Sequence, residues 1–496
     1  MTKQITKHFM AFFLSLLMAV SMGLTAFAEG EVSGQNTTTY KLTLTGTATG
    51  HTYEAYQIFT GDLSTKEDGT KVLSNVAWGT GVTYTGTESA ADVAKALSDG
   101  TIKIADLEDK LKLTTPAKTV PSTERSTVID GLAAGYYLVK DKDGTQKDKS
   151  DAYTKFIVQV VGDTEAAVKS DVPTVVKKVK DTNDSTGTTS DWQDSADYDI
   201  GDDVSYQITG TMPANIADYT TYKYTFTDTM SKGLTYTAKN AKITIGTTDV
   251  TSSFEEIVTT KEDGTTEVTW SCDNLKGIEG VTLNKDTKVV VTYSAKLNEN
   301  AVLGAAGNPN EVDLTYSNNP NKGGEEETGK TPKDKNIVFT YKTVVNKVDQ
   351  DKKFLAGAAF KLEKKLKDGS YKLVKEFTAG EETSFTFNGL DDGVYKLSET
   401  TTPAGYNTIA PIEFTISAEH DTDSAYPELT KLTGNVTKGE ATFTVDKDAG
   451  SLTTDVVNKK GSTLPSTGGI GTTIFYAAGG ALVVLAGVMI AARKRA

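Results

Sequence analysis

The chain has 496 residues, more than one hydrophobic core normally organises, so several domains are expected. Hydrophobic residues make up 37% of the chain and charged residues 24%, a balance typical of folded soluble domains rather than of disordered or polytopic membrane proteins. The formal net charge of -14 repels phosphate backbones and argues against nucleic-acid binding.

Cysteine and histidine are too scarce for most site chemistry. The single cysteine, Cys272, cannot form an intramolecular disulfide and is interpreted as a structural residue. His8, His51 and His420 lie far apart in the sequence, so a histidine-based metal site is not expected. The sequence contains no recognisable nucleophile–base pair or phosphate-binding loop. We therefore expect a protein that is not an enzyme and that needs no cofactor or metal.

The beginning of the chain has the pattern of a secretory signal peptide. Lys3 and Lys7 precede an apolar run from Phe9 to Leu24, and Ala26-Phe27-Ala28 offers a small-residue cleavage site. This pattern predicts a secreted protein whose mature chain begins at Glu29.

The mature chain is dominated by strand patterns. Residues 40–45 and 288–293 alternate apolar and polar side chains, which predicts half-buried strands, whereas residues 89–98 form the clearest helical pattern. Asp-Gly turn signals recur along the chain, at residues 68–69, 143–144, 263–264, 368–369 and 392–393. We predict an all-β protein of tandem immunoglobulin-like β-sandwiches in an elongated rod.

Shifts in composition suggest where the domains begin and end. A new strand pattern starts after Asp171-Val172-Pro173, and the stretch 318–334 is rich in Asn, Gly, Glu and Lys, as linkers are. The predicted segments are a signal peptide (1–28), an N-terminal domain (29–170), a middle domain (171–325), a linker (326–337), a C-terminal domain (338–460) and a terminal segment (461–496).

The middle segment resembles the fimbrial isopeptide-forming domain of Gram-positive pili. The motifs that carry the resemblance are residues 173–181, 224–230 and 307–316. In that family a lysine and an asparagine join in an intramolecular amide bond beside an acidic residue. The resemblance implies Lys177 as the nucleophile, Asp228 as the acid and Asn310 as the acceptor.

Other positions in the middle segment could fill these roles. Adjacent residues of a strand face opposite sides, so Lys178 would replace Lys177 if the strand register shifted by one residue. Asn308 and Asn318 are alternative acceptors.

The C-terminal segment resembles the collagen-adhesin B-type immunoglobulin-like domain. Its motifs include a so-called E-box around Glu399 and lie at residues 345–349, 355–362, 393–400, 403–406 and 456–459. The resemblance implies an amide bond between Lys347 of the first strand and Asn458 of the last strand, with Glu399 as the acid.

Physical chemistry agrees with such a crosslink. A lysine, a carboxyl and an asparagine are costly to bury in a sandwich unless they satisfy one another. Desolvation favours the neutral amine, which is nucleophilic, and the neutral acid, which can polarise the amide and assist the departure of ammonia. The amide product leaves no charge in the core.

The end of the chain resembles a sortase sorting signal. The motif consists of Leu464, Pro465, Ser466, Thr467 and Gly468, and it precedes an apolar stretch (470–492) and a basic tail (493–495). The apolar stretch is long enough to span a membrane as a helix, and the tail would hold its end in the cytoplasm. By resemblance, a sortase cleaves after Thr467 and joins its carbonyl to an amine of a cell-wall precursor or of another subunit.

The N-terminal segment is less informative. Residues 131–139 resemble an E-box strand but lack the glutamate, so no crosslink is expected there. Shaft pilins carry an acceptor lysine in a Tyr-Pro-Lys motif between their first two domains. This chain has no such tripeptide, and Lys169 occupies about the same place.

Together these patterns predict the structural subunit of a covalently polymerised, sortase-assembled pilus, most simply its shaft. The expected partners are sortase, like subunits and peptidoglycan; a host surface ligand is a further candidate, and nucleic acid is not expected. The expected location is the cell wall and surface. The alternative is a monomeric wall-anchored adhesin, which would give no ladder of covalent multimers.

Overall fold

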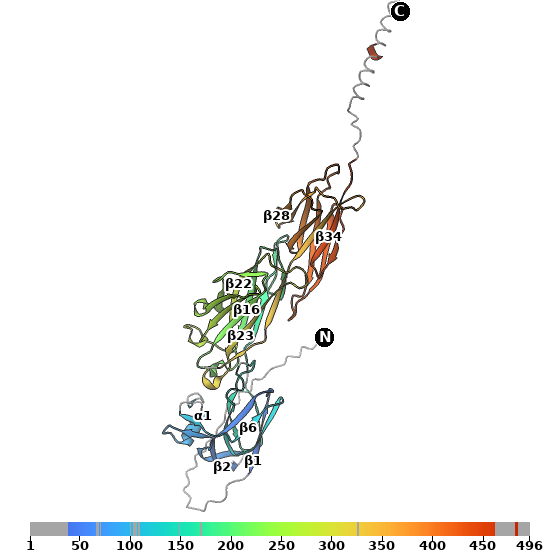
Figure 1. Ribbon diagram of the computed structural model, residues 1–496. Coiled ribbons are helices and arrows are strands. Elements are labelled where there is room, and N and C mark those ends of the chain that lie inside the picture. Colours follow the sequence, from blue (N-terminus) through green and yellow to red (C-terminus); the bar gives the residue numbers. More distant parts are fainter. Residues whose placement is uncertain are drawn as a thin grey trace, which may run out of the picture. The chain divides into compact units, whose positions relative to one another are not determined.

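The computed structural model (Figure 1) describes residues 38–461, except 66–68, 70, 100, 103–106, 108–109, 148, 169–170, 325–326, together with 482–484. These residues are mostly strands, which confirms the all-β prediction. The predicted signal peptide and sorting motif lie outside the described residues, as does the apolar stretch apart from Leu482–Val484. Within the described ranges, no helix is long and apolar enough to cross a membrane.

Contacts within the chain group it into two compact units. The first contains the described residues up to Val179, Asp203–Lys296 and Pro309–Asn336, and the second contains Lys180–Asp202, Leu297–Asn308 and the described residues from Ile337 onward. Two segments that the sequence assigns to the middle domain therefore pack with the C-terminal residues. The domain boundaries proposed from the sequence stay predictions.

The first unit begins with a sandwich of two sheets. One sheet has the order β10 (Thr164–Ala167), β1 (Thr39–Thr45), β7 (Ser126–Ala133). The other has the order β3 (Lys71–Trp78), β2 (Thr52–Thr65), β8 (Gly135–Asp141), β9 (Lys155–Val160), with β6 (Lys118–Pro121) also on β2; β4 (Val82–Tyr84) and β5 (Leu111–Leu113) form a separate pair. The alternation predicted for β1 is present, because Leu42 and Leu44 are buried against Tyr53 and Val139 of the second sheet.

The predicted helix is α1 (Ala90–Ser98). Ser89 caps its N-terminus, because the Ser89 side chain accepts a hydrogen bond from the Asp92 backbone N–H. Val93 and Ala94 of α1 are buried in the same hydrophobic cluster as Phe59 and Tyr136.

The first unit continues with two further sheets. The first has the order β11 (Val175–Val179), β15 (Asp203–Thr211), β22 (Lys288–Leu297), β18 (Lys242–Ile245), β19 (Thr248–Asp249), with β17 (Leu234–Tyr236) on β22. The second contains β24 (Thr328–Lys330), β23 (Asn308–Ser317), β16 (Tyr224–Met230), β21 (Thr266–Cys272) and β20 (Glu255–Thr260). Short 3-10 helices connect the two sheets at Ile216–Asp218, Thr251–Ser253 and Leu275–Gly277, and another, Pro320–Lys322, lies between β23 and β24. The free Cys272 is buried at the end of β21.

In the second unit, short strands precede the C-terminal sandwich. The strands β12 (Thr182–Asn183) and β13 (Thr188–Thr189) form a hairpin, and β14 (Ser195–Asp197) pairs in parallel with the end of β25 (Asp334–Phe339).

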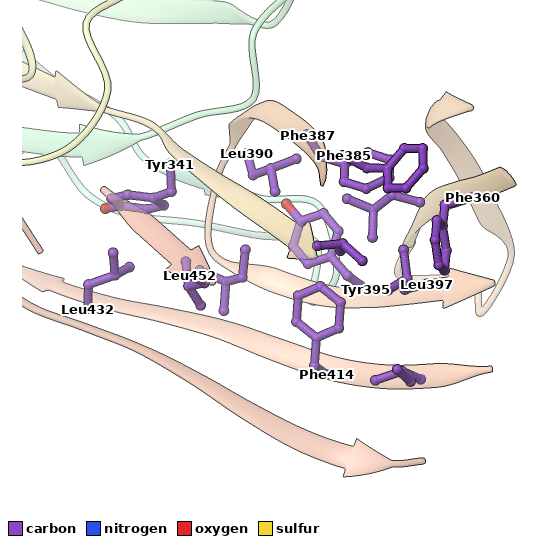
Figure 2. Close-up of a cluster of buried hydrophobic side chains, with 14 of the residues drawn as sticks. Tyr341, Phe360, Phe385, Phe387, Leu390, Tyr395, Leu397, Phe414, Leu432 and Leu452 are labelled. Atoms are coloured by element: carbon purple, nitrogen blue, oxygen red, sulfur yellow. The ribbon is translucent and has the colours of Figure 1, made fainter. Parts of the chain in front are cut away.

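The C-terminal sandwich consists of a four-stranded and a five-stranded sheet. The first has the order β29 (Ser384–Leu390), β26 (Tyr341–Asp349), β34 (Ser451–Asn458), β33 (Thr444–Asp446). The second has the order β28 (Tyr371–Phe377), β27 (Ala359–Lys365), β30 (Gly393–Thr401), β31 (Ile412–His420), β32 (Leu429–Lys438). The core between them contains Phe385, Tyr395 and Phe414 (Figure 2), and the rings of the last two stack at 5.7 Å.

We expect Phe387→Ala to destabilise the C-terminal sandwich by about 3–5 kcal/mol, because Phe387 is fully buried in this core and its loss leaves a cavity. The free energy of unfolding in guanidinium measures the effect. The matched control is Leu373→Ala, since Leu373 is 52% exposed and should change stability little. Equal losses in the two variants would contradict this placement of the core.

Candidate crosslink sites

The first candidate site lies between the two middle sheets. Lys177 of β11 and Tyr293 of β22 come from one sheet, and Asp228 of β16 and Asn310 of β23 come from the other. Along each strand, buried positions alternate with more exposed ones, and all four side chains occupy buried positions. None of the four is more than 5% exposed. Asp228 and Asn310 lie diagonally on neighbouring strands, because Met230 is the direct partner of Asn310.

A hydrogen-bond network connects the four side chains. The Lys177 Nζ atom donates to both carboxylate oxygens of Asp228, at 2.8 and 2.9 Å, and to the Tyr293 hydroxyl at 2.6 Å. The Tyr293 hydroxyl donates to Asp228 Oδ2 and accepts from Asn310 Nδ2 at 2.9 Å. The structure therefore brings together the three residues singled out in the sequence and adds a tyrosine that the sequence analysis missed.

Burial moves this lysine–aspartate pair toward its neutral form. Desolvation lowers the pKa of Lys177 even though the Asp228 carboxylate raises it. Desolvation also raises the pKa of Asp228, against the opposing effect of Lys177. A neutral amine beside a neutral acid is the combination that attack on an amide requires.

The alternative residues of the middle segment have other contacts. Lys178 is adjacent to Lys177 and so faces the opposite side of β11. The Asn308 side chain donates to the backbone oxygens of Val302 and Val338. Asn318 Nδ2 donates to the backbone oxygen of Gln146 at 2.8 Å. Geometry favours Lys177 and Asn310, although the bond itself stays a prediction.

The second candidate site lies inside the C-terminal sandwich. Lys347 of β26 and Asn458 of β34 are on adjacent parallel strands, two positions apart in register. Glu399 of β30 reaches them from the facing sheet. Asn458 Nδ2 donates to the two Glu399 oxygens at 2.9 and 3.1 Å, and Lys347 Nζ lies 4.0 Å from Glu399 Oε1. Lys347 and Asn458 are fully buried.

The electrostatics of the second site also suit an amide-forming reaction. Burial lowers the pKa of Lys347 to about 8, although Glu399 raises it. Thr402 Oγ1 and the Ile409 backbone N–H donate to Glu399 Oε2 and hold the carboxyl in place. The buried Asn458 Oδ1 atom has no hydrogen-bond partner among the described residues, so a protonated carboxyl could donate to the amide carbonyl.

A third buried lysine shows what distinguishes these sites. Lys364 Nζ donates to Asp391 and, at 2.8 Å, to Asp199. Burial lowers the pKa of Lys364, but the Asp391 and Asp199 carboxylates outweigh it and the pKa is raised. Lys364 therefore keeps its charge. It belongs to an ion cluster and does not act as a nucleophile.

Two groups of described residues could hold a cation. The ligand atoms of Asp181, Asp197 and His420 lie within 4.8 Å of one another, as do those of Asp184, Asp199 and Asp202. In the first group, His420 Nε2 is 3.5 Å from Asp181 Oδ2. The sequence analysis did not anticipate that the fold gathers these residues.

Three regions of the chain match family models. Residues 200–320 match the Gram-positive pilin backbone subunit 2, Cna-B-like domain. Residues 342–428 match the SpaA prealbumin-like fold domain, and residues 456–496 match the LPXTG cell wall anchor motif. The resemblance to Gram-positive pilins is confirmed. The anchor motif makes the chain a cell wall-anchored surface protein.

Known pilins share sequence and fold with this chain. The trypsin-resistant surface T6 protein of Streptococcus pyogenes serotype M6 is 27% identical over 402 residues, covering 68% of this chain and 71% of the relative. The T6 backbone pilin structure has a TM-score of 0.54 at 18% identity, over 87% of this chain and 100% of that one. The major pilin SpaD of Corynebacterium diphtheriae has a TM-score of 0.50 at 18% identity, with the same coverage. These structures share the fold.

Two predicted sites cannot be placed in the structure. The sorting residues Leu464–Gly468 and the acceptor candidate Lys169 lie outside the described residues. Their roles stay predictions.

We expect the Lys347–Asn458 bond to form more slowly above about pH 8. The reaction needs one proton shared between the amine and Glu399, and the amine loses that proton above its pKa of about 8. The measurement is the rate of ammonia loss after refolding at a series of pH values, with refolding followed separately by circular dichroism. A rate that keeps rising above pH 8 would mean that only the neutral amine matters.

Proposed function

We propose that the chain is a structural subunit of the shaft of a covalently polymerised surface pilus, stabilised by two intramolecular Lys–Asn amide bonds. The observation that carries the proposal is the pair of buried lysine–acid–asparagine sites, at Lys177 and Lys347, in a chain with pilin domains and a cell wall anchor motif. Sortase, like subunits and peptidoglycan are the partners that this function requires.

The position of the second site suits a protein under tension. Lys347 is on the first strand of the C-terminal sandwich and Asn458 is the last residue of its last strand. These strands run in parallel side by side, so a force on the two ends of the sandwich would shear them apart. An amide bond between them would carry that force, in the way that disulfides constrain other secreted proteins.

The chemistry is a self-modification that occurs once in each chain. The lysine amine attacks the asparagine side-chain carbonyl, ammonia leaves, and a neutral amide replaces a buried charged pair. Because no turnover follows, we expect no enzymatic activity toward other substrates. We assign the acceptor for the sorting signal to Lys169 by its place between the first two predicted domains.

We expect the wild-type chain to lack the mass of two ammonia molecules relative to its sequence, once its processed ends are taken into account. Lys177→Met and Lys347→Met should each restore one ammonia, because methionine fills the site but cannot attack an amide. Intact mass and the masses of crosslinked proteolytic peptides provide the measurement.

The matched control for these variants is Lys178→Met, which changes the neighbouring residue on the opposite side of β11 and should keep both deficits. An unshifted wild-type mass would remove the amide bonds from the proposal and leave an anchored protein of the pilin fold.

Polymerisation gives a separate prediction. Co-expression with a pilus sortase should give a ladder of covalent multimers on a denaturing gel, and Lys169→Arg should abolish it, because arginine keeps the charge but its guanidinium does not form the amide. Lys180→Arg is the control and should keep the ladder. A wild-type chain that stays monomeric would instead favour the wall-anchored adhesin.

A further inference from the structure

The two candidate sites place their acids differently relative to the amide. Glu399 contacts the Asn458 amide directly, at 2.9 and 3.1 Å. In the described middle site no hydrogen bond joins Asp228 to Asn310, and the Tyr293 hydroxyl lies between them. Aspartate is one methylene shorter than glutamate, about 1.5 Å of reach. The tyrosine hydroxyl spans the distance that the shorter acid leaves.

We propose that Tyr293 is a catalytic residue of the Lys177–Asn310 crosslink, whose hydroxyl relays a proton from Asp228 to the departing amide nitrogen. This inference rests on the proposed function, because it concerns the same bond. It assigns to the middle site a fourth reacting group, which has no counterpart in the direct contact between Glu399 and Asn458.

The Tyr293 hydroxyl has the contacts that a relay needs. It accepts from Lys177 Nζ and Asn310 Nδ2 and donates to Asp228 Oδ2, which uses its single proton and both lone pairs. It therefore touches the nucleophile, the acid and the leaving group at once. Once Asp228 has taken the Lys177 proton, the hydrogen bond between Asp228 and Tyr293 reverses, and the hydroxyl proton can turn from Asp228 to the amide nitrogen.

The surroundings hold the ring in place and keep the hydroxyl protonated. The Tyr293 ring stacks on Tyr206 at 5.2 Å, with 19° between the planes, and contacts Tyr236 and Trp270 at 5.7 and 5.4 Å. Burial raises the pKa of Tyr293 well above its usual value, and the Asp228 carboxylate adds to the shift. The hydroxyl can pass a proton on, but it does not stay ionised.

The reaction balances with these groups alone. The Lys177 ammonium gives a proton to Asp228, and the free amine attacks the side-chain carbonyl carbon of Asn310. Asp228 then donates its proton to the Tyr293 hydroxyl as that hydroxyl donates its own to the amide nitrogen. The carbon–nitrogen bond breaks and ammonia leaves. The new amide nitrogen returns its extra proton to Asp228, which ends neutral.

The test compares wild type with Tyr293→Phe in the full chain, which keeps the ring and removes only the hydroxyl. Samples taken at intervals after protein synthesis is stopped are digested, and linked and unlinked peptides are quantified for both sites. We expect Lys177–Asn310 bond formation to slow by about 100-fold or more. Formation of the Lys347–Asn458 bond in the same molecules should not change, which provides an internal control.

A second variant separates proton relay from packing. Adding Asp228→Glu to Tyr293→Phe lengthens the acid into the volume that the hydroxyl vacates, so the carboxyl can contact the amide as Glu399 contacts Asn458. We expect the double variant to form the Lys177–Asn310 bond at least about tenfold faster than Tyr293→Phe alone.

Each other outcome has a definite meaning. A Tyr293→Phe chain that links Lys177 at the wild-type rate would overturn the relay. A slow single variant without recovery in the double variant would also overturn it, since Tyr293 would then act only through packing. Absence of the Lys177–Asn310 bond from the wild type would instead refute the proposed crosslink itself.

Discussion

A lysine amine in the core of a β-sandwich is the constraint on which both candidate sites depend. An isolated buried charge costs several kcal/mol, so the facing sheet must supply an acid and any remaining polar groups must find partners. Lys177 and Lys347 are both fully buried, and each faces a carboxyl from the opposite sheet. Conversion of the pair into a neutral amide removes the charge, and it ties one sheet or strand to another by a covalent bond.

Three lysines at 0% exposure differ in how much negative charge surrounds them. Lys364 has two aspartates within hydrogen-bond distance, and its pKa rises. Lys177 and Lys347 each face one acid, and desolvation prevails and lowers their pKa. The additional carboxylates around Lys364 therefore distinguish an ion cluster from a nucleophile, because burial alone lowers the pKa of a lysine.

This mode of stabilisation fits the composition of the chain. The single cysteine is buried and cannot form an intramolecular disulfide, so any covalent crosslink within the chain must use other side chains. The first and last strands of the C-terminal sandwich are the two that a pulling force would separate, and they carry Lys347 and Asn458. In a cell wall-anchored surface protein of the pilin fold, the proposed bond would resist force at that place.

The sequence by itself determined the all-β fold, the helix at residues 89–98 and the resemblance to Gram-positive pilins, because alternation, turn signals and contiguous motifs are local features. It also pointed to Lys177, Asp228 and Asn310, although it left Lys178, Asn308 and Asn318 open. Only the tertiary structure separated them, since strand register decides which side chain faces the core.

Tyr293 was not predicted, because an inward tyrosine in β22 has the pattern of any core residue. Local patterns also do not encode contacts between residues far apart in the chain. Such contacts pack residues 180–202 with the C-terminal sandwich and place Asp199 beside Lys364.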